Sequence, residues 1–226
     1  SSFDTKKRLL MNGVDVSTRY TMRSREMYQR YATYIFRVVK AKMGNYLIFF
    51  PSYRFMEDVY QEFTQLLASD EEEMELVIQQ KHMDEEEREN FLRAFEMGRE
   101  KSLIGFGVLG GIFSEGIDLT NEKLIGTLII GTGLPQVCNE REILKSYFDQ
   151  KGLYGFDYAY RYPGMNKVLQ AAGRVIRTED DRGVILLLDE RFQREKGKEI
   201  FPKEWADCER CRLDIVEEKI RLFWEK

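Results

Sequence analysis

Cysteine, histidine and long apolar runs are all scarce in this sequence. Three cysteines and one histidine among 226 residues offer no disulfide framework and few metal ligands. No run approaches the roughly 18 consecutive apolar residues of a membrane span, and the opening residues lack the apolar core of a signal peptide. We therefore expect a cytoplasmic protein with no membrane partner.

An excess of charge of either sign is also lacking. The 35 basic and 39 acidic residues give a net charge of −4, so no global field attracts nucleic acid, although a local groove can still be basic. With 43% apolar and 33% charged residues, a folded, soluble protein is expected.

The metal-binding signal is weak. Cys208 and Cys211 form a CxxC pair, but a structural zinc or iron–sulfur site needs four ligands, and only the distant Cys138 and His82 remain to complete one. We interpret the pair as neighbours on one turn of a helix and expect no metal in this chain.

A phosphate-binding loop is absent as well. The pattern Gly-x-x-x-x-Gly-Lys-Ser/Thr occurs nowhere in the sequence. The run Val184–Glu190 (VILLLDE) imitates a magnesium-binding strand, but without that loop we interpret Asp189 and Glu190 as the end of an ordinary core strand. This chain alone is not expected to hydrolyse ATP.

Short apolar runs alternate with amphipathic stretches along the chain. This alternation predicts an α/β fold in three layers, with a mostly parallel sheet covered by helices on both faces. One domain is expected over 1–226, with an extended lead-in over 1–23 and an α/β core over 24–226 that ends in a helical extension. The expected strands are 46–50, 75–80, 102–109, 124–130 and 183–188, and the expected helices are 24–43, the stretch capped by Ser52, 84–98, 139–150 and 162–177.

Capping residues mark three of these helix starts. Ser52 and Asn139 are suited to N-caps, and Asp84 with Glu87 resembles a capping box whose helix Gly98 ends. The helix after Asn139 carries four apolar or aromatic residues on one face: Ile143, Leu144, Tyr147 and Phe148.

Glycine-rich segments follow two of the expected strands. Gly110–Leu119 (GGIFSEGIDL) could cradle a ligand with backbone N–H groups while Ser114, Glu115 and Asp118 supply polar contacts, or it could be a plain turn capped by Ser114. Gly131–Pro135 (GTGLP) follows the next strand. Because parallel strands end at one edge of a sheet, both loops are expected at the same edge.

The helix over 162–177 (YPGMNKVLQAAGRVIR) is predicted to have an apolar stripe and a cationic face. The cationic face holds Lys167, Gln170, Arg174 and Arg177, and it is either a solvated surface or a phosphate-facing one. Gly173 favours the second interpretation, because a glycine inside a helix costs about 1 kcal/mol relative to alanine. These residues and the two glycine-rich loops are expected to form one convergent site.

Four segments in this order resemble one family. They are NYLIFFPSYRFMEDV, GGIFSEGIDL, GTGLP and YPGMNKVLQAAGRVIR, followed by GVILLLDERF. Together they closely resemble the C-terminal motor domain of DinG/XPD-like superfamily 2 DNA helicases, and the resemblance spans nearly the whole chain. It implies a RecA-like fold of the P-loop NTPase type.

The resemblance implies roles for individual residues. Gln170, Arg174 and Arg177, with Gly173, match a motif whose arginines reach the γ-phosphate of ATP across a cleft. Ser114, Glu115, Gly116 and Asp118 match a motif that links the nucleotide to the DNA groove, and Ser52, Tyr53 and Arg54 match a region near the single strand.

The resemblance also implies partners. ATP and Mg²⁺ would bind mainly to a first RecA-like motor domain outside this chain, which would also carry any iron–sulfur cluster. Single-stranded or forked DNA would be the substrate of unwinding in repair or replication. The alternative is a non-catalytic RecA-like module that binds single-stranded DNA or a partner protein, whereas the missing phosphate loop disfavours an independent nucleotide hydrolase.

Overall fold

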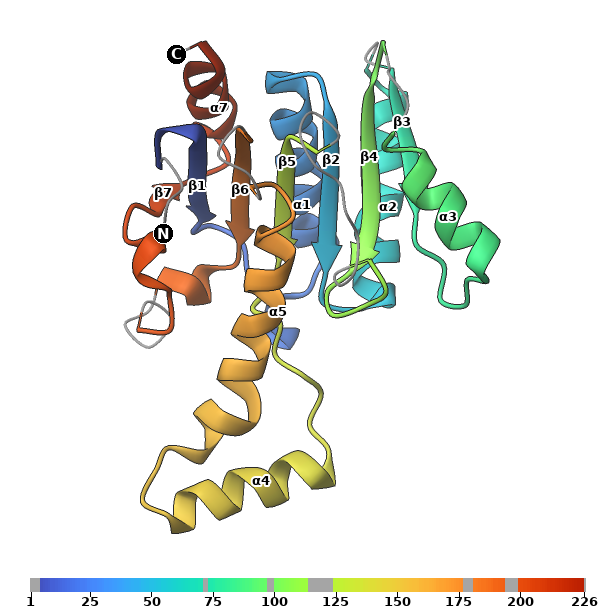
Figure 1. The fold of residues 1–226 in the computed structure, drawn as a ribbon. Coiled ribbons are helices and arrows are strands. Elements are labelled where there is room, and N and C mark those ends of the chain that lie inside the picture. The colour runs from blue at the N-terminus through green and yellow to red at the C-terminus, as the bar shows by residue number, and fades with distance from the viewer. Residues whose placement is uncertain are drawn as a thin grey trace.

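The structure is a computed structural model that describes residues 5–70, 73–96, 100–113, 124–176, 181–193 and 199–225. Seven parallel strands form one sheet in the order β3-β4-β2-β5-β6-β1-β7 (Figure 1). The strands are β1 (Arg8–Gly13), β2 (Asn45–Phe50), β3 (Met74–Ile78), β4 (Ser102–Val108), β5 (Gly126–Ile130), β6 (Gly183–Leu188) and β7 (Glu209–Cys211).

Helices connect these strands. The α-helices are α1 (Arg25–Ala41), α2 (Tyr53–Ala68), α3 (Glu85–Arg93), α4 (Asn139–Gln150), α5 (Tyr162–Ala172) and α7 (Val216–Glu225). A π-helix, η4 (Asp157–Arg161), leads into α5. The 3₁₀ turns within the described ranges are η1 (Thr5–Lys7), η2 (Tyr20–Met22), η5 (Glu190–Gln193) and η6 (Lys203–Trp205). No helix in the described part of the chain is long and apolar enough to cross a membrane.

The sheet is covered on both faces, which confirms the three-layer prediction. Side chains alternate between the faces of a strand, so Tyr46, Ile48 and Phe50 of β2 join the core formed with α1, α2 and α7. Leu47 and Phe49 join the opposite core, with α3 and α5. All six residues of β2 are buried, as the continuous apolar run predicts for a strand inside a parallel sheet.

Capping residues in the sequence correctly predict the starts of two helices. The Ser52 hydroxyl accepts a hydrogen bond from the Phe55 N–H (3.3 Å), and Asp84 and Glu87 form a reciprocal capping box, so both predictions are confirmed. The prediction for Asn139 is wrong, because Cys138 occupies the cap position and Asn139 is the first helical residue. Gly98, the expected stop of α3, lies outside the described residues.

The expected lead-in contains an interior strand. β1 pairs in parallel with β6 on one side and with β7 on the other. The buried Asn12 amide donates hydrogen bonds to the carbonyls of Leu187 and Asp189, both at 3.0 Å. The extended segment is therefore integrated into the sheet.

The prediction of a helical CxxC pair is wrong. Cys211 ends strand β7, and Cys208 lies just before it, because pairing with β1 draws this segment into the sheet. Burial raises the pKa of the Cys211 thiol to about 12, which disfavours the thiolate that a metal would need. No group of three His, Cys, Asp or Glu side chains in the described ranges is placed to hold a metal ion.

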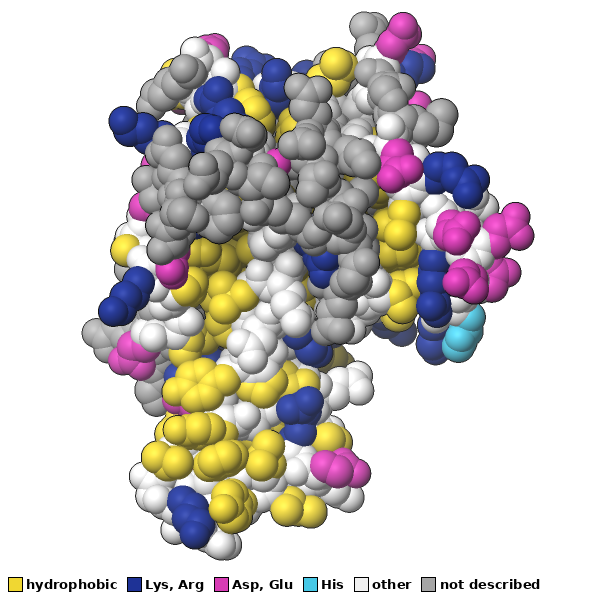
Figure 2. Space-filling model, in the orientation of Figure 1, with side chains coloured by type: hydrophobic (Ala, Val, Ile, Leu, Met, Phe, Trp, Pro, Cys, Tyr) yellow, Lys and Arg dark blue, Asp and Glu magenta, His cyan; other side chains and the backbone are white. Residues whose placement is uncertain are grey.

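A helical arm projects beyond the carboxyl edge of the sheet. It consists of α4 and η4, and Figure 1 shows it below the sheet, ahead of α5. The stacked rings of Phe148 and Tyr158 (4.2 Å between centroids) join its two halves, and Arg141 donates to the Ala159 carbonyl (2.7 Å). No residue of α4 is buried, and hydrophobic side chains such as Ile143 gather on the arm's surface (Figure 2).

Candidate functional site

The segment after β2 places three predicted DNA-contacting residues at the carboxyl edge of the sheet. Ser52 caps α2, Tyr53 is its first helical residue, and Arg54 is exposed. Because the Ser52 hydroxyl already accepts a hydrogen bond from the helix, it is left as a donor toward any ligand. The segment therefore combines a hydroxyl donor, a phenol and a cation at one helix start.

Gln79 fixes the orientation of Tyr53. Its side-chain amide donates to the Tyr53 hydroxyl oxygen and its side-chain carbonyl accepts from the Val108 N–H, each at 2.8 Å. Its backbone N–H donates to the Phe106 carbonyl, also at 2.8 Å. Gln79 is only 2% exposed, so this one side chain ties the end of β3 to β4 and α2. Gln79 could not be identified from the sequence alone, since a polar residue just past a short strand carries no distinguishing pattern.

The described part of the first glycine-rich loop, residues 110–113, lies at the same edge as Gly131–Pro135, as predicted, and both meet the start of α5. Gly133 has φ +67° and lies so close to Gly164 that a Cβ at position 133 would be 2.5 Å from the Gly164 carbonyl oxygen. A Cβ at Gly110 would be 2.9 Å from the side-chain carbons of Lys167. The loops after β4 and β5 thus converge on the first turns of α5.

The other end of α5 departs from the prediction. The helix ends at Ala172 with Gly173 as its C-cap, so Gly173 is not inside a helix and its expected cost there does not arise. Gln170 is exposed, but Arg174 is only 8% exposed. The placement of Arg174 on an open cationic face is wrong, because the 100° rotation per residue does not continue past the last helical turn.

The predicted single site is also divided. Val175 packs on Gly183, the first residue of β6, so Arg174 lies toward the amino ends of the strands. Lys167 lies near the carboxyl edge, five residues before the end of α5 at Ala172, which is about 7.5 Å along the helix axis at 1.5 Å per residue. Ser114, Glu115, Gly116, Asp118 and Arg177 lie outside the described residues.

A buried ion pair at the ends of β1 and β6 adds a feature that the sequence analysis missed. Asp189 is fully buried and accepts hydrogen bonds from the Thr18 N–H (3.0 Å) and hydroxyl (2.8 Å) and from Arg191 (2.8 Å). Burial alone would raise the pKa of Asp189, but the hydrogen bonds and charge of Arg191 outweigh it and hold the pKa below its usual value. Asp189 is therefore a charged anchor for the segment after β1, and more than the end of a core strand.

Comparison with known proteins places this arrangement in a family. A family model described as the helicase C-terminal domain matches residues 35–208. The chain belongs to the helicase C-terminal domain family. Over 187 residues this helicase domain is 30% identical to the "ATP-dependent DNA helicase XPD" of Sulfolobus acidocaldarius, a match that covers 80% of the chain and 31% of that protein.

One further relative and one solved structure are also XPD helicases. The "General transcription and DNA repair factor IIH helicase subunit XPD/RAD3" of Saccharomyces cerevisiae is 28% identical over 196 residues, covering 82% of this helicase domain and 24% of the yeast protein. A solved structure titled XPD helicase shares the fold with a TM-score of 0.71 at 24% identity, covering 91% of the domain and 35% of that chain. The domain therefore spans about a quarter to a third of the length of these relatives.

Proposed function

We propose that this chain is the second motor domain of an ATP-dependent DNA helicase. The observation that carries the proposal is the match of the helicase C-terminal domain to residues 35–208, together with relatives that are named ATP-dependent DNA helicases. The chain contributes no phosphate loop, so ATP and Mg²⁺ bind mainly to a first RecA-like domain of the same polypeptide. Any iron–sulfur cluster also belongs to that first domain, and the protein acts in the cytoplasm on DNA during repair or replication.

In this proposal the residues in the last turn of α5 and just after it complete the nucleotide site. Gln170, Arg174 and Arg177 approach the γ-phosphate when the two motor domains close, and the arginines stabilise the charge of the transferring phosphoryl group. Ser114, Glu115, Gly116 and Asp118 couple that site to the DNA. The exposure of Gln170 suits a direct contact, whereas Arg174 needs the segment around it to rearrange on closure, since its side chain is buried here.

The single strand is proposed to cross the carboxyl edge of the sheet. Ser52, Tyr53 and Arg54 provide a hydroxyl, an aromatic ring and a cation there, which is the combination that single-strand tracks use for phosphates and bases. Closing and reopening of the cleft then alternates the grip of the two motor domains on the DNA backbone. Unwinding of single-stranded or forked substrates follows from this movement.

The burial of Arg174 favours one alternative, a non-catalytic module that binds single-stranded DNA or a partner protein. The two functions are distinguished by comparing ATP hydrolysis by the 226-residue chain and by the full-length polypeptide, each with and without single-stranded DNA. The motor proposal predicts no hydrolysis above background and weak, salt-sensitive DNA binding for the chain, but DNA-stimulated hydrolysis for the full-length protein. A full-length protein without stimulated hydrolysis would favour the module.

A further inference from the structure

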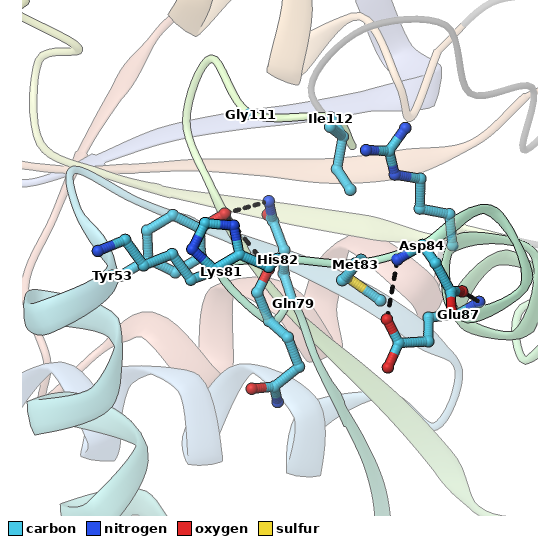
Figure 3. A pocket seen from close by; sticks show the side chains of 11 residues that line it. Tyr53, Gln79, Lys81, His82, Met83, Asp84, Glu87, Gly111 and Ile112 are labelled. Atoms are coloured by element: carbon cyan, nitrogen blue, oxygen red, sulfur yellow. Dashed lines mark hydrogen bonds between the residues drawn. The ribbon is translucent and has the colours of Figure 1, made fainter.

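A pocket of about 560 Å³ opens beside Tyr53. Its lining comes from the start of α2, from the segment between β3 and α3 together with the first turn of α3, and from the loop after β4. Figure 3 shows Tyr53, Lys81 and His82 on one side of it, Asp84 and Glu87 on the other, and Ile112 above. The pocket therefore extends the same sheet edge on which Ser52, Tyr53 and Arg54 lie.

The cations at this pocket have no acidic partners among the described residues. Lys81 and Arg88 line it and make no ion pair with any side chain that the structure describes. The two lining acids are already occupied. The Asp84 carboxylate accepts from the Glu87 N–H (2.8 Å), and the Glu87 carboxylate accepts from the Asp84 N–H (2.9 Å). Lys81 and Arg88 are therefore open to contact with an anion, while the charges of these four lining side chains sum to zero.

The distribution of charge around α3 supports this assignment. In Figure 2 the acidic side chains of this region gather on the outer rim, while basic side chains lie between that rim and a hydrophobic patch next to the body. The cyan side chain below them is His82, the single histidine of the protein. An anion that approaches from the side of the sheet edge meets the basic side chains first.

The remaining walls are suited to a flat, partly apolar group. Met83 and Ile112 contribute apolar surface, and Ile112 is 38% exposed. Tyr53 contributes an aromatic ring whose hydroxyl is held by Gln79 (2.8 Å), so this wall is fixed in orientation before any ligand arrives. Cations beside a rigid aromatic and apolar wall match the chemistry of a nucleotide, with its phosphate and its base.

We propose that this pocket binds one nucleotide unit of single-stranded DNA, with its phosphates at Lys81 and Arg88 and its base against Met83 and Ile112. The proposal rests on the proposed function as a DNA motor and extends the strand's path past Tyr53 to the segment after β3. Gln79 acts as a positioning residue, since it reaches the strand through Tyr53.

The first test measures binding of fluorescein-labelled oligothymidine to the full-length protein without ATP, across a series of salt concentrations. Lys81→Ala and Arg88→Ala should each weaken binding about fivefold near 0.1 M salt and reduce the salt slope by about 0.7, the value for one phosphate contact on a single strand. Arg93→Ala and Lys101→Ala are matched controls, because Arg93 pairs with Glu89 and Lys101 with Glu73, outside the pocket. Slopes unchanged by Lys81→Ala and Arg88→Ala would overturn the proposal.

The second test detects the position of the base by fluorescence. Oligothymidine that carries one 2-aminopurine should brighten at a single position when that base leaves the stack for the pocket. Ile112→Trp, which fills the mouth, should abolish this signal while Ile112→Ala retains it, and equal signals in both variants would contradict base binding. A wild-type protein that shows DNA-stimulated ATP hydrolysis but no brightening at any single position would overturn this proposal alone. A wild-type protein that neither binds DNA nor shows stimulated hydrolysis would overturn the proposed function itself.

Discussion

At the scale of single residues, Asp189 holds a buried negative charge at the carboxyl edge of the sheet. Its hydrogen bonds come from Thr18 and Arg191, so the carboxylate links the segment after β1 to the segment after β6. Breaking a buried ion pair by removing one charge costs about 3–5 kcal/mol. Since Arg191 keeps partial contact with solvent, Asp189→Asn should lower the free energy of unfolding by about 3 kcal/mol at neutral pH.

The pH dependence of this loss follows from the pKa of Asp189. Its folded-state pKa lies below the ordinary value of 3.8, so its stabilisation is fully present above that value and is lost as the pH falls through the folded pKa. The free energies of unfolding of the wild type and of Asp189→Asn, measured with denaturant from neutral pH into the acid range, should therefore differ by a constant amount above pH 3.8 and approach each other below it. Curves that stay parallel over this range would contradict a depressed pKa.

Gly133 is the second residue whose identity the structure explains. It combines φ +67° with close contact to the Gly164 carbonyl, whereas Gly152 has φ +76° and nothing within 4 Å of an added Cβ. Gly152→Ala should thus lower the free energy of unfolding by about 1–2 kcal/mol, because alanine is strained in the left-handed conformation. Gly133→Ala should lower it clearly more, because the added Cβ would also clash with the Gly164 carbonyl. The free energies of unfolding of the two variants measure the difference, and equal losses would show that the contact between the loop and α5 does not constrain the chain.

At the scale of elements, the serine caps of α1 and α2 allow the structural role of a helix cap to be distinguished from a role in DNA binding. Ser24 caps α1 by accepting from the Met27 N–H (3.2 Å), and Ser52 caps α2 in the same way. Each serine-to-alanine change should lower the free energy of unfolding by about 1 kcal/mol. Only Ser52→Ala should also weaken binding of single-stranded DNA by the full-length protein, because Ser24 is not among the residues assigned to the strand. Equal DNA affinities in the two variants would remove Ser52 from the track.

The elements that the sequence predicted well are those defined by local chemistry. The apolar run of β2 and the Ser52 cap of α2 are decided within a few residues, and both were predicted correctly. The strand that contains Cys211 could not be predicted in this way, because it exists only through pairing with β1, about 200 residues earlier in the chain. Arg174 was misplaced for a related reason, since the end of α5 depends on contacts that hydrophobic periodicity does not contain.

At the scale of the whole molecule, the fold separates two regions that the sequence analysis had merged. The carboxyl edge gathers the residues after β2, β3, β4 and β5, including Tyr53, Gln79 and Gly133. Arg174 lies at the far end of α5, beside the start of β6. In the proposed motor, the first region would hold DNA and the second would meet the nucleotide. The candidate residues could be selected from motifs, but their division between two regions required the path of α5.

The central claim is that Arg174 and Arg177 complete an ATP site on another domain. The measurement that tests it most directly is DNA-stimulated ATP hydrolysis by full-length protein carrying Arg174→Ala or Arg177→Ala, with ATP and DNA affinities measured in parallel. Because Arg174 is buried, Arg174→Lys and thermal unfolding control for loss of the fold. Both alanine variants should lose most turnover, on the order of 10³-fold, while still binding ATP and DNA. Near-normal turnover in both folded variants would contradict the account.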